Sequence, residues 1–257
     1  MKSLLWRLTA VLLLGLASVA ARAETLKIAA ASDLKFAMAE LVEQFRAERP
    51  DARVDVIYGS SGKFATQISN GAPYDLFFSA DIDYPRQLER DGYTTGPPRP
   101  FALGRIVLWS LKPALANTPL ADLPRTDLRR LAIANPQHAP YGRRAEEALR
   151  HHGAWEALAS RLALGENIAH AAQFVDSGAA DAGIVALALV LAPTLQGKGA
   201  WTLIPAEWHS PLEQGFAITR RAADKPLAHA FADFIGRDAA RAVLRRYGFE
   251  LPATEGR

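Results

Sequence analysis

Short apolar runs alternate with amphipathic stretches through most of the chain. Residues 26–30 and 53–58 have the composition and spacing of strands, whereas the apolar residues of 34–45 recur on one face of a helix. A second, short helix is predicted for residues 63–70. Repeated strand–helix order of this kind predicts an α/β fold with mostly parallel sheets.

The same order continues along the rest of the chain. Further strands are predicted at residues 74–79, 131–134, 181–186, 203–205 and 216–220. Further helices are predicted at residues 82–91, 143–152, 155–162, 167–177, 228–234 and 239–247. No internal repeat and no low-complexity tract interrupts this alternation.

The apolar run at residues 101–111 predicts a strand long enough to cross between two lobes. The strand at residues 216–220 can return the chain to the first lobe. We therefore expect two lobes, each a mostly parallel sheet flanked by helices, with the ligand in the interlobe cleft. Residues 24–104 and 213–257 form lobe I, residues 105–212 form lobe II, and the hinges lie near 104–106 and 211–215. A single doubly wound domain is the alternative.

The first residues predict export. Lys2 and Arg7 precede an apolar stretch at residues 8–21, and Ala21-Arg22-Ala23 is a small-x-small cleavage site. Residues 1–23 are therefore interpreted as a cleaved signal peptide. A membrane anchor is the weaker alternative, because a spanning helix needs about 20 apolar residues.

Charge and cysteine content narrow the function classes. The whole chain has 30 basic and 27 acidic residues, and the signal peptide carries three of the basic ones and no acid. A mature chain with balanced charge gives no support to a nucleic-acid partner. Cysteine is absent, which excludes disulfides and the cysteine that lipid-anchors many bacterial receptors. The sequence thus predicts a free protein of the periplasm.

Four strand-to-helix junctions carry the candidate chemistry. They are Ala30-Ala31-Ser32-Asp33, Gly59-Ser60-Ser61-Gly62, Ala139-Pro140-Tyr141-Gly142 and Gly165-Glu166-Asn167-Ile168. The first N–H groups of a helix lack internal partners, and the helix dipole adds positive charge there. Any single serine at such a place is an ordinary helix cap. Four junctions, two from each expected lobe, instead predict one shared anion site.

The same residues indicate the kind of anion. A dianion held only by neutral N–H and O–H donors stays deprotonated. Each charge-assisted hydrogen bond to it contributes about 1.5–3 kcal/mol. The junctions lack the arginine or lysine pairs of phosphate clamps. Lys63 is the exception, and we interpret it as a solvated surface residue. A tetrahedral dianion is therefore the expected ligand.

Several motifs together resemble the periplasmic molybdate-binding proteins of ABC transporters. They are Ala29-Ala30-Ala31-Ser32, Gly59-Ser60-Ser61-Gly62-Lys63, Asn70-Gly71-Ala72-Pro73-Tyr74-Asp75-Leu76-Phe77-Phe78-Ser79-Ala80-Asp81, Asn135-Pro136-Gln137-His138-Ala139-Pro140-Tyr141-Gly142, Gly183-Ile184-Val185-Ala186 and Arg246-Tyr247-Gly248-Phe249. The resemblance covers nearly the whole mature chain. It implies the two-lobed periplasmic-binding-protein fold and a monomer that binds molybdate, or tungstate, without a cofactor. It also implies delivery to a membrane permease driven by a cytoplasmic ATPase.

The resemblance also implies particular ligand residues. Ser32 and Ser61 match serines that bind the oxyanion through hydroxyl and N–H groups, and Tyr141 and Ile168 match residues that supply backbone N–H groups. Molybdenum would be present only as the central atom of the oxyanion that these same residues bind. Ser60 is kept as a further candidate.

Two positions complicate this assignment. Some relatives have a tyrosine where this chain has Ala186, so that donor is missing, and we hypothesise that Tyr141 forms part of the wall or supplies an alternative donor. Asp33 is a further candidate through its N–H, but its carboxylate would repel a dianion. We therefore expect its side chain to point away.

Other chemistries fit the sequence less well. A receptor for sulfate or phosphate remains an alternative to a molybdate receptor. A secreted serine hydrolase would need Gly-x-Ser-x-Gly, and Lys63 stands where the second glycine belongs. His151 and His152 are adjacent and so face different directions on a helix, which does not favour a metal site. We therefore expect a binding protein and not an enzyme.

Overall fold

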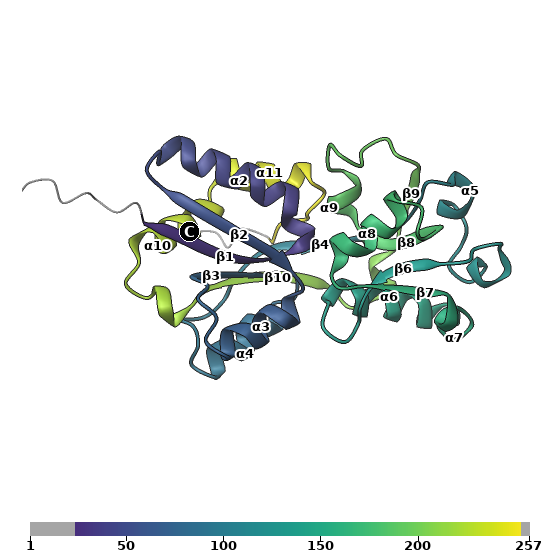
Figure 1. Ribbon diagram of the computed structural model, residues 1–257, viewed down its shortest axis with the longest axis horizontal. Helices are drawn as coiled ribbons and strands as arrows, with labels where there is room; N and C mark the ends of the chain where they lie inside the picture. Colours follow the sequence, from purple (N-terminus) through teal and green to yellow (C-terminus); the bar gives the residue numbers. More distant parts are fainter. Residues whose placement is uncertain (1–23, 253–257) are drawn as a thin grey trace, which may run out of the picture.

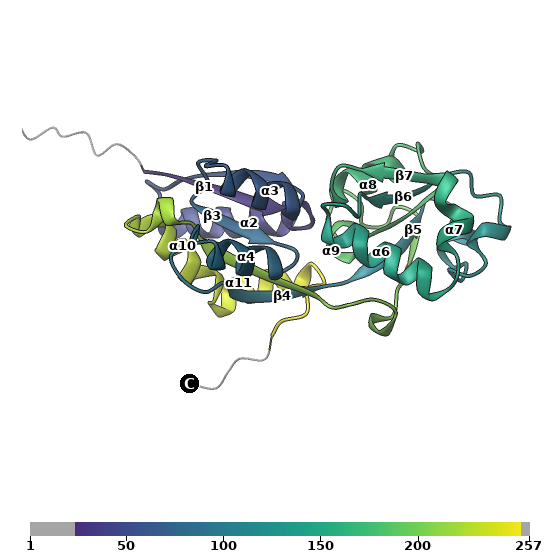
Figure 2. The same cartoon turned by 90° about the horizontal axis from the view of Figure 1, so that it is seen from below.

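The computed structural model describes residues 24–252, arranged as two lobes, each built on one five-stranded sheet (Figure 1). The predicted signal peptide, residues 1–23, lies outside the described residues. The strand order is β2-β1-β3-β10-β4 in lobe I and β7-β6-β8-β5-β9 in lobe II. Figure 2 shows that the chain passes between the lobes beside β4, along one side of the molecule.

The strands of lobe I come from both ends of the chain, and those of lobe II from its middle. Lobe I contains β1 (Thr25–Ala31), β2 (Arg53–Gly59), β3 (Leu76–Ser79), β4 (Arg99–Gly104) and β10 (Leu212–Ile218). Lobe II contains β5 (Ile106–Ser110), β6 (Leu131–Ala134), β7 (Leu162–Gly165), β8 (Ala182–Ala186) and β9 (Ala200–Leu203). The exact boundaries, 24–104 and 213–257 for lobe I and 105–212 for lobe II, stay a prediction.

Helices cover both faces of each sheet (Figures 1 and 2). Those of lobe I are η1 (Ser32–Leu34), α2 (Lys35–Glu48), α3 (Ser61–Ser69), α4 (Asp83–Arg90), η5 (Arg220–Ala222), α10 (Pro226–Ile235) and α11 (Asp238–Arg246). Those between β5 and β10 are α5 (Pro113–Ala116), η2 (Leu123–Arg125), α6 (Pro140–His151), α7 (Trp155–Leu158), η3 (Ala159–Arg161), α8 (Ile168–Asp176), α9 (Leu187–Val190) and η4 (Ala206–Trp208). The face of α2 predicted to be apolar is buried, as Ala37, Met38, Leu41, Val42 and Phe45 show.

Both sheets are mixed, but four of the five strands in each run in the same direction, so the prediction of mostly parallel sheets is confirmed. In lobe I, β1 pairs in parallel with β2 and β3, whereas β10 pairs antiparallel with β3 and β4. In lobe II, β6 pairs in parallel with β7 and β8, whereas β5 pairs antiparallel with β8 and β9. The one reversed strand is β10 in lobe I and β5 in lobe II. Both lie where the chain crosses between the lobes, and strand–helix alternation does not reveal their direction.

Two local predictions need correction. The single long strand expected at residues 101–111 is two strands, β4 and β5, because Arg105 separates a half that pairs in lobe I from a half that pairs in lobe II. The helix expected at residues 155–162 ends earlier, and β7 follows it as an unpredicted strand. Strand β7 has only four residues, of which Gly165 alone is buried, and this pattern is too short to identify.

Each lobe buries its own hydrophobic core. In lobe I the rings of Phe78 and Phe216 stack with centroids 4.8 Å apart, and Phe45 meets Phe231 edge to face at 5.0 Å. Such aromatic pairs contribute about 0.5–1.5 kcal/mol each beyond their burial. In lobe II the indole N–H of Trp109 donates to the backbone oxygen of Lys198 at 2.9 Å. Separate cores allow the lobes to move as units.

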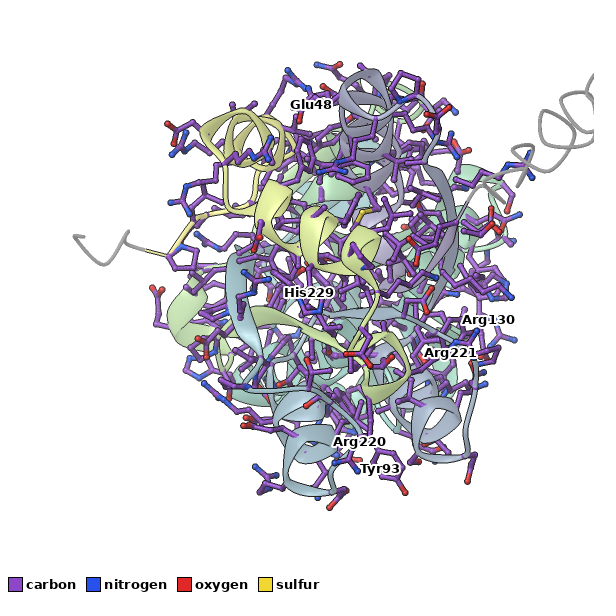
Figure 3. All side chains as sticks on the ribbon, turned by 90° about the vertical axis from the view of Figure 1, so that its left-hand side faces the viewer. Glu48, Tyr93, Arg130, Arg220, Arg221 and His229 are labelled. Atoms are coloured by element: carbon purple, nitrogen blue, oxygen red, sulfur yellow. The ribbon has the colours of Figure 1, made fainter. Side chains whose placement is uncertain are left out.

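The outer end of lobe I is polar. Arg220, Arg221 and His229 lie at its surface when the molecule is viewed from that end (Figure 3). Within residues 24–252, no helix combines the length and the apolar character needed to cross a membrane.

Candidate oxyanion site

A small cavity of about 10 Å³ lies between the lobes, where the four predicted junctions meet. Lobe I contributes the ends of β1 and β2, which are aligned because Ala31 pairs with Gly59. Lobe II contributes the starts of α6 and α8, which follow β6 and β7. The wall residues are Ala31, Ser32, Asp33, Gly59, Ser60, Ser61, Ala80, Ala139, Pro140, Tyr141 and Ile168. Every candidate residue named from the sequence is among them.

Three helices begin at this cavity. Ser61 is the first residue of α3, Tyr141 the second of α6 and Ile168 the first of α8. No side chain caps α3 or α6, and the Asn167 side chain caps α8 by accepting from the N–H of His170. Among the described residues, the N–H groups of Ser61, Tyr141 and Ile168 have no hydrogen-bond acceptor, and the positive ends of three helix dipoles lie beside the cavity.

The Ser61 side chain is set up as a donor. It is fully buried, and its Oγ accepts the backbone N–H of Ala80 at 3.0 Å. Because that bond uses a lone pair of the oxygen, the hydroxyl proton remains free to donate to a ligand. Ser61 thus offers both an N–H and an O–H to the cavity.

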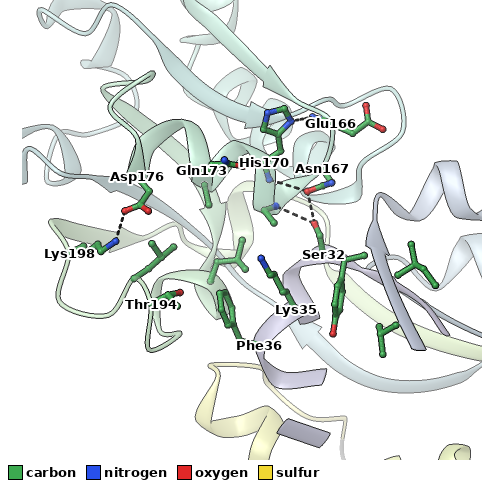
Figure 4. A pocket seen from close by; sticks show the side chains of 17 residues that line it. Ser32, Lys35, Phe36, Glu166, Asn167, His170, Gln173, Asp176, Thr194 and Lys198 are labelled. Atoms are coloured by element: carbon green, nitrogen blue, oxygen red, sulfur yellow. Dashed lines mark hydrogen bonds and ion pairs between the residues drawn. The ribbon is translucent and has the colours of Figure 1, made fainter. Parts of the chain in front are cut away.

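The Ser32 hydroxyl bridges the lobes instead. It donates to Oδ1 of Asn167 at 3.0 Å and accepts the backbone N–H of Ala169 at 3.2 Å (Figure 4). Asn167 was part of a predicted junction but was not identified as a contact of Ser32. An anion that binds the Ser32 hydroxyl must take the place of Asn167 as its acceptor.

Ser60 also faces the opposite lobe. Its Oγ lies 2.9 Å from Nδ1 of His138, and the backbone oxygen of His138 accepts the N–H of Gly62 at 3.0 Å. Burial and the nearby Lys63 ammonium lower the pKa of His138. Sequence reasoning missed His138 because no pattern marks a loop residue that closes against the other lobe.

Asp33 and Tyr141 form a buried pair beside the cavity. Oδ2 of Asp33 accepts from the Tyr141 hydroxyl at 3.0 Å and from Nε2 of Gln214 at 2.6 Å. Burial raises the pKa of Asp33 to about 6, although both bonds lower it. Burial and the Asp33 carboxyl raise the pKa of Tyr141 well above its ordinary value. Sequence reasoning missed Gln214, because its burial and its place at the irregularity of β10 are visible only in the structure.

Tyr141 therefore forms part of the cavity wall, while its hydroxyl donates to Asp33. The space around that hydroxyl is tight, because a Cβ on Gly104 would lie 2.3 Å from it. Ala186, at the position where some relatives have tyrosine, is fully buried at the end of β8. The wall hypothesis for Tyr141 fits this geometry, whereas a donor role would require the hydroxyl to leave Asp33.

Ion pairs at the rim also join the lobes. Lys63 pairs with Glu166 across the cleft, so the interpretation of Lys63 as a merely solvated residue needs correction. Asp81 of lobe I accepts from Arg143 at 3.2 Å and from Arg144 at 3.4 Å, both on α6. The arrangement of the lobes is thus a closed one, held by contacts that exist only when they meet.

A wider groove of about 940 Å³ opens beside the small cavity. Lys35, Phe36 and Tyr58 line it from lobe I, and His170 and Gln173 from lobe II (Figure 4). Ser32 borders both spaces. The groove therefore adjoins the cavity at Ser32, and Lys35 places a cation along it. Among the residues that the structure describes, no cluster of three or more His, Cys, Asp or Glu side chains could hold a metal ion.

Comparison with known proteins identifies a family. The family described as bacterial extracellular solute-binding protein matches residues 26–250. The molybdate-binding protein ModA of Azotobacter vinelandii is 36% identical over 95% of this chain and 97% of its own length. ModA of Rhodobacter capsulatus is 34% identical over 93% of this chain and 92% of its own.

Solved structures agree in fold. The periplasmic molybdate-binding protein of Azotobacter vinelandii superposes with a TM-score of 0.83 at 34% identity, covering 88% of this chain and 99% of that one. The sulfate-binding protein SubI from Mycobacterium tuberculosis gives a TM-score of 0.71 at 15% identity, over 90% and 88% of the two chains, which supports the fold alone. The predicted two-lobed fold is confirmed.

Proposed function

The chain belongs to the family of bacterial extracellular solute-binding proteins, and we propose that its solute is molybdate, with tungstate as a second ligand. A family of this kind binds solutes and does not convert them, so the chain is not an enzyme. The Ser60–His138 contact is accordingly part of the closed lobe interface and not a nucleophile with its base.

One observation carries the proposal: uncapped helix starts from both lobes meet at one buried cavity. The N–H groups of Ser61, Tyr141 and Ile168 and the hydroxyl of Ser61 are neutral donors, which suit a fully deprotonated tetrahedral dianion. Each such bond contributes about 1.5–3 kcal/mol, so four bonds suffice for tight capture. Ser32 adds its hydroxyl when the ligand displaces Asn167, and Asp33 and Ser60 complete the wall.

Location and partners follow from the same family. We propose that the signal peptide is cleaved and that the mature monomer works in the periplasm. It would release its ligand to the permease of an ABC importer, powered by a cytoplasmic ATPase, and it would need no cofactor. One relative, of Bacillus subtilis, carries the name of a putative ABC transporter substrate-binding lipoprotein, at 26% identity over 88% of this chain and 86% of its own.

Calorimetry of residues 24–257 against molybdate, tungstate, sulfate and phosphate tests the proposal. Molybdate and tungstate are expected to bind tightly at one site. Sulfate is a smaller tetrahedron, which fixed N–H donors cannot all reach, so it should bind far more weakly. Equal affinity for sulfate, or for phosphate, would replace the molybdate assignment by the alternative oxyanion receptor.

A serine pair in α3 provides the matched variants. Ser61→Ala removes a hydroxyl from the cavity and should weaken molybdate binding by about 10- to 100-fold, the value of one charge-assisted bond. Ser69→Ala removes a hydroxyl at the far end of the same helix and should leave affinity unchanged. Thermal unfolding of both variants would show whether Ser61→Ala still folds. Unchanged molybdate affinity in folded Ser61→Ala would contradict the assigned site.

A further inference from the structure

Asp33 is the one charged residue among those that line the cavity, and its carboxyl lies beside the cavity, bonded to Tyr141 and Gln214. It is 1% exposed, and its two oxygens differ. Oδ2 accepts from Tyr141 and Gln214, whereas Oδ1 is buried without a hydrogen-bond partner among the described residues. A buried carboxylate oxygen left without a donor is costly, and protonation relieves that cost.

The surroundings of Asp33 offer no compensating charge. The groups that face it are the Tyr141 phenol from α6, the Gln214 amide from β10, and the backbone N–H groups of Asp33 and Leu34. These N–H groups lower the pKa of Asp33 but are too poorly placed to hydrogen-bond to Oδ1. Helix α9, which packs against η1, is the apolar run Leu187–Val190. The basic residues Lys35 of α2 and His170 of α8 line the open groove instead.

Closure creates this environment. Tyr141 belongs to lobe II and Asp33 to lobe I, so an open cleft would expose the carboxyl to water and to its ordinary pKa of about 3.9. In the closed arrangement burial raises the pKa to about 6 before any anion is present. A dianion in the cavity adds like-charge repulsion and raises the pKa of Asp33 further.

We propose that Asp33 takes up a proton from solvent when the lobes close on a dianionic oxyanion, so that capture of this ligand is proton-linked. The proposal deepens the proposed function and rests on it. Protonation converts the repelling carboxylate into a neutral group, consistent with the neutral donors around it. No covalent bond changes, and release of the anion on opening returns the proton to solvent.

Proton linkage fixes the direction in which molybdate affinity changes with pH. Because the closed complex binds more protons than the open protein, affinity falls as the pH rises between the Asp33 pKa of the open protein and that of the complex. The expected loss is up to about tenfold in affinity per pH unit inside that window. Above the pKa of the complex, affinity becomes independent of this group.

Calorimetry at one pH in two buffers of different ionisation enthalpy measures the proton directly. It is done on residues 24–257 at near-neutral pH, where free molybdate is a dianion. The observed enthalpy of molybdate binding should change with the buffer, corresponding to uptake of up to about one proton per molybdate. Asp33→Asn should bind molybdate with no uptake and with a flat pH profile.

A control variant and a nearby titratable side chain complete the test. Asp55→Asn alters an exposed carboxyl of β2 and should keep the proton uptake of the unmodified chain. His138, which contacts Ser60 of the cavity wall, is another titratable group nearby, and uptake that persists in Asp33→Asn would assign the proton elsewhere and overturn the proposal. Identical enthalpies in both buffers for the unmodified chain would overturn it as well. Absence of any molybdate binding would instead contradict the proposed function itself.

Discussion

Tyr141 lies in the proposed ligand site and also forms part of the closed interface. Its backbone N–H lies in the first turn of α6, while its hydroxyl reaches Asp33 in the other lobe. Its ring is buried, so it also fixes the shape of the cavity wall. Backbone and side chain therefore contribute to affinity in separable ways.

Substitution at Tyr141 should separate them. Tyr141→Phe keeps the wall and the backbone N–H but loses the bond to Asp33, which should weaken molybdate binding by less than about tenfold. Tyr141→Ala also removes the ring from a packed wall, and we expect a larger loss because truncating a buried aromatic costs about 3–5 kcal/mol. Titration with molybdate checks both variants. Unchanged affinity in both would end the hypothesis that this side chain matters to binding.

The residues that sequence reasoning could identify are those fixed by local pattern. Ser32, Ser61, Tyr141 and Ile168 stand at strand-to-helix junctions, and local sequence sets which N–H groups a helix leaves free. Partners that meet only across the cleft could not be found this way. The hydrogen bond between Ser32 and Asn167 joins residues 135 positions apart in the sequence, and the bond between Asp33 and Gln214 joins residues 181 positions apart.

At the scale of elements, helix α2 and strand β10 show what a single sequence determines. The apolar face of α2 was predictable because its spacing is that of a helix. Strand β10 begins at Leu212, earlier than the predicted start at 216, because pairing with β4 extends it. Pairing partners and strand direction are tertiary properties, so local propensity predicted neither them nor the mixed sheets.

The start of β8 is stabilised by a buried charge. Asp181 has a side chain that is 5% exposed, and it accepts from Lys112 at 2.9 Å and from the backbone N–H groups of Arg129 and Arg130. Burial alone raises the pKa of Asp181, but these donors outweigh burial and hold the pKa well below its usual range. The ionised carboxylate thus joins β8 to the segment that precedes β6.

The sign of the pH effect follows from that lowered pKa. A carboxyl whose pKa is lower in the folded chain stabilises the fold above its unfolded pKa of about 3.9, and the contribution is lost as the pH falls through the folded value. Asp181→Asn should lower the free energy of unfolding by about 2 kcal/mol near neutral pH. The difference should shrink below about pH 4.

Denaturant unfolding at several pH values measures this, with Asp122→Asn as control. Asp122 pairs with Arg125 at an exposed site, so its loss should change stability by less than about 0.5 kcal/mol. A constant difference between Asp181→Asn and the unmodified chain at all pH values would contradict the electrostatic account of β8.

At the scale of the whole molecule, closure depends on a close approach of the lobes at Gly62. Its N–H donates to the backbone oxygen of His138 in lobe II. A Cβ at this position would lie 2.7 Å from that oxygen and 2.7 Å from the hydroxyl of Tyr84. Glycine is therefore needed here for the lobes to meet, and the hinges predicted near residues 104–106 and 211–215 would carry the movement.

Gly62→Ala should consequently hinder closing. We expect molybdate affinity to fall by about tenfold or more, since ligand bonds from both lobes form together only in the closed state. X-ray scattering should show that the unmodified protein contracts on adding molybdate and that Gly62→Ala contracts less. Gly96→Ala, where the added Cβ meets no atom within 4 Å, should behave like the unmodified chain. A radius of gyration that does not change with molybdate would count against closure.

The central claim is that helix starts from both lobes hold one small dianion. A crystal structure with molybdate, in which the anomalous scattering of molybdenum locates the ion, tests this most directly. We expect one peak in the cavity of Ser32, Ser61, Tyr141 and Ile168, with ligand oxygens bonded to N–H groups of both lobes. A peak in the open groove beside Lys35, or contacts from one lobe alone, would contradict it.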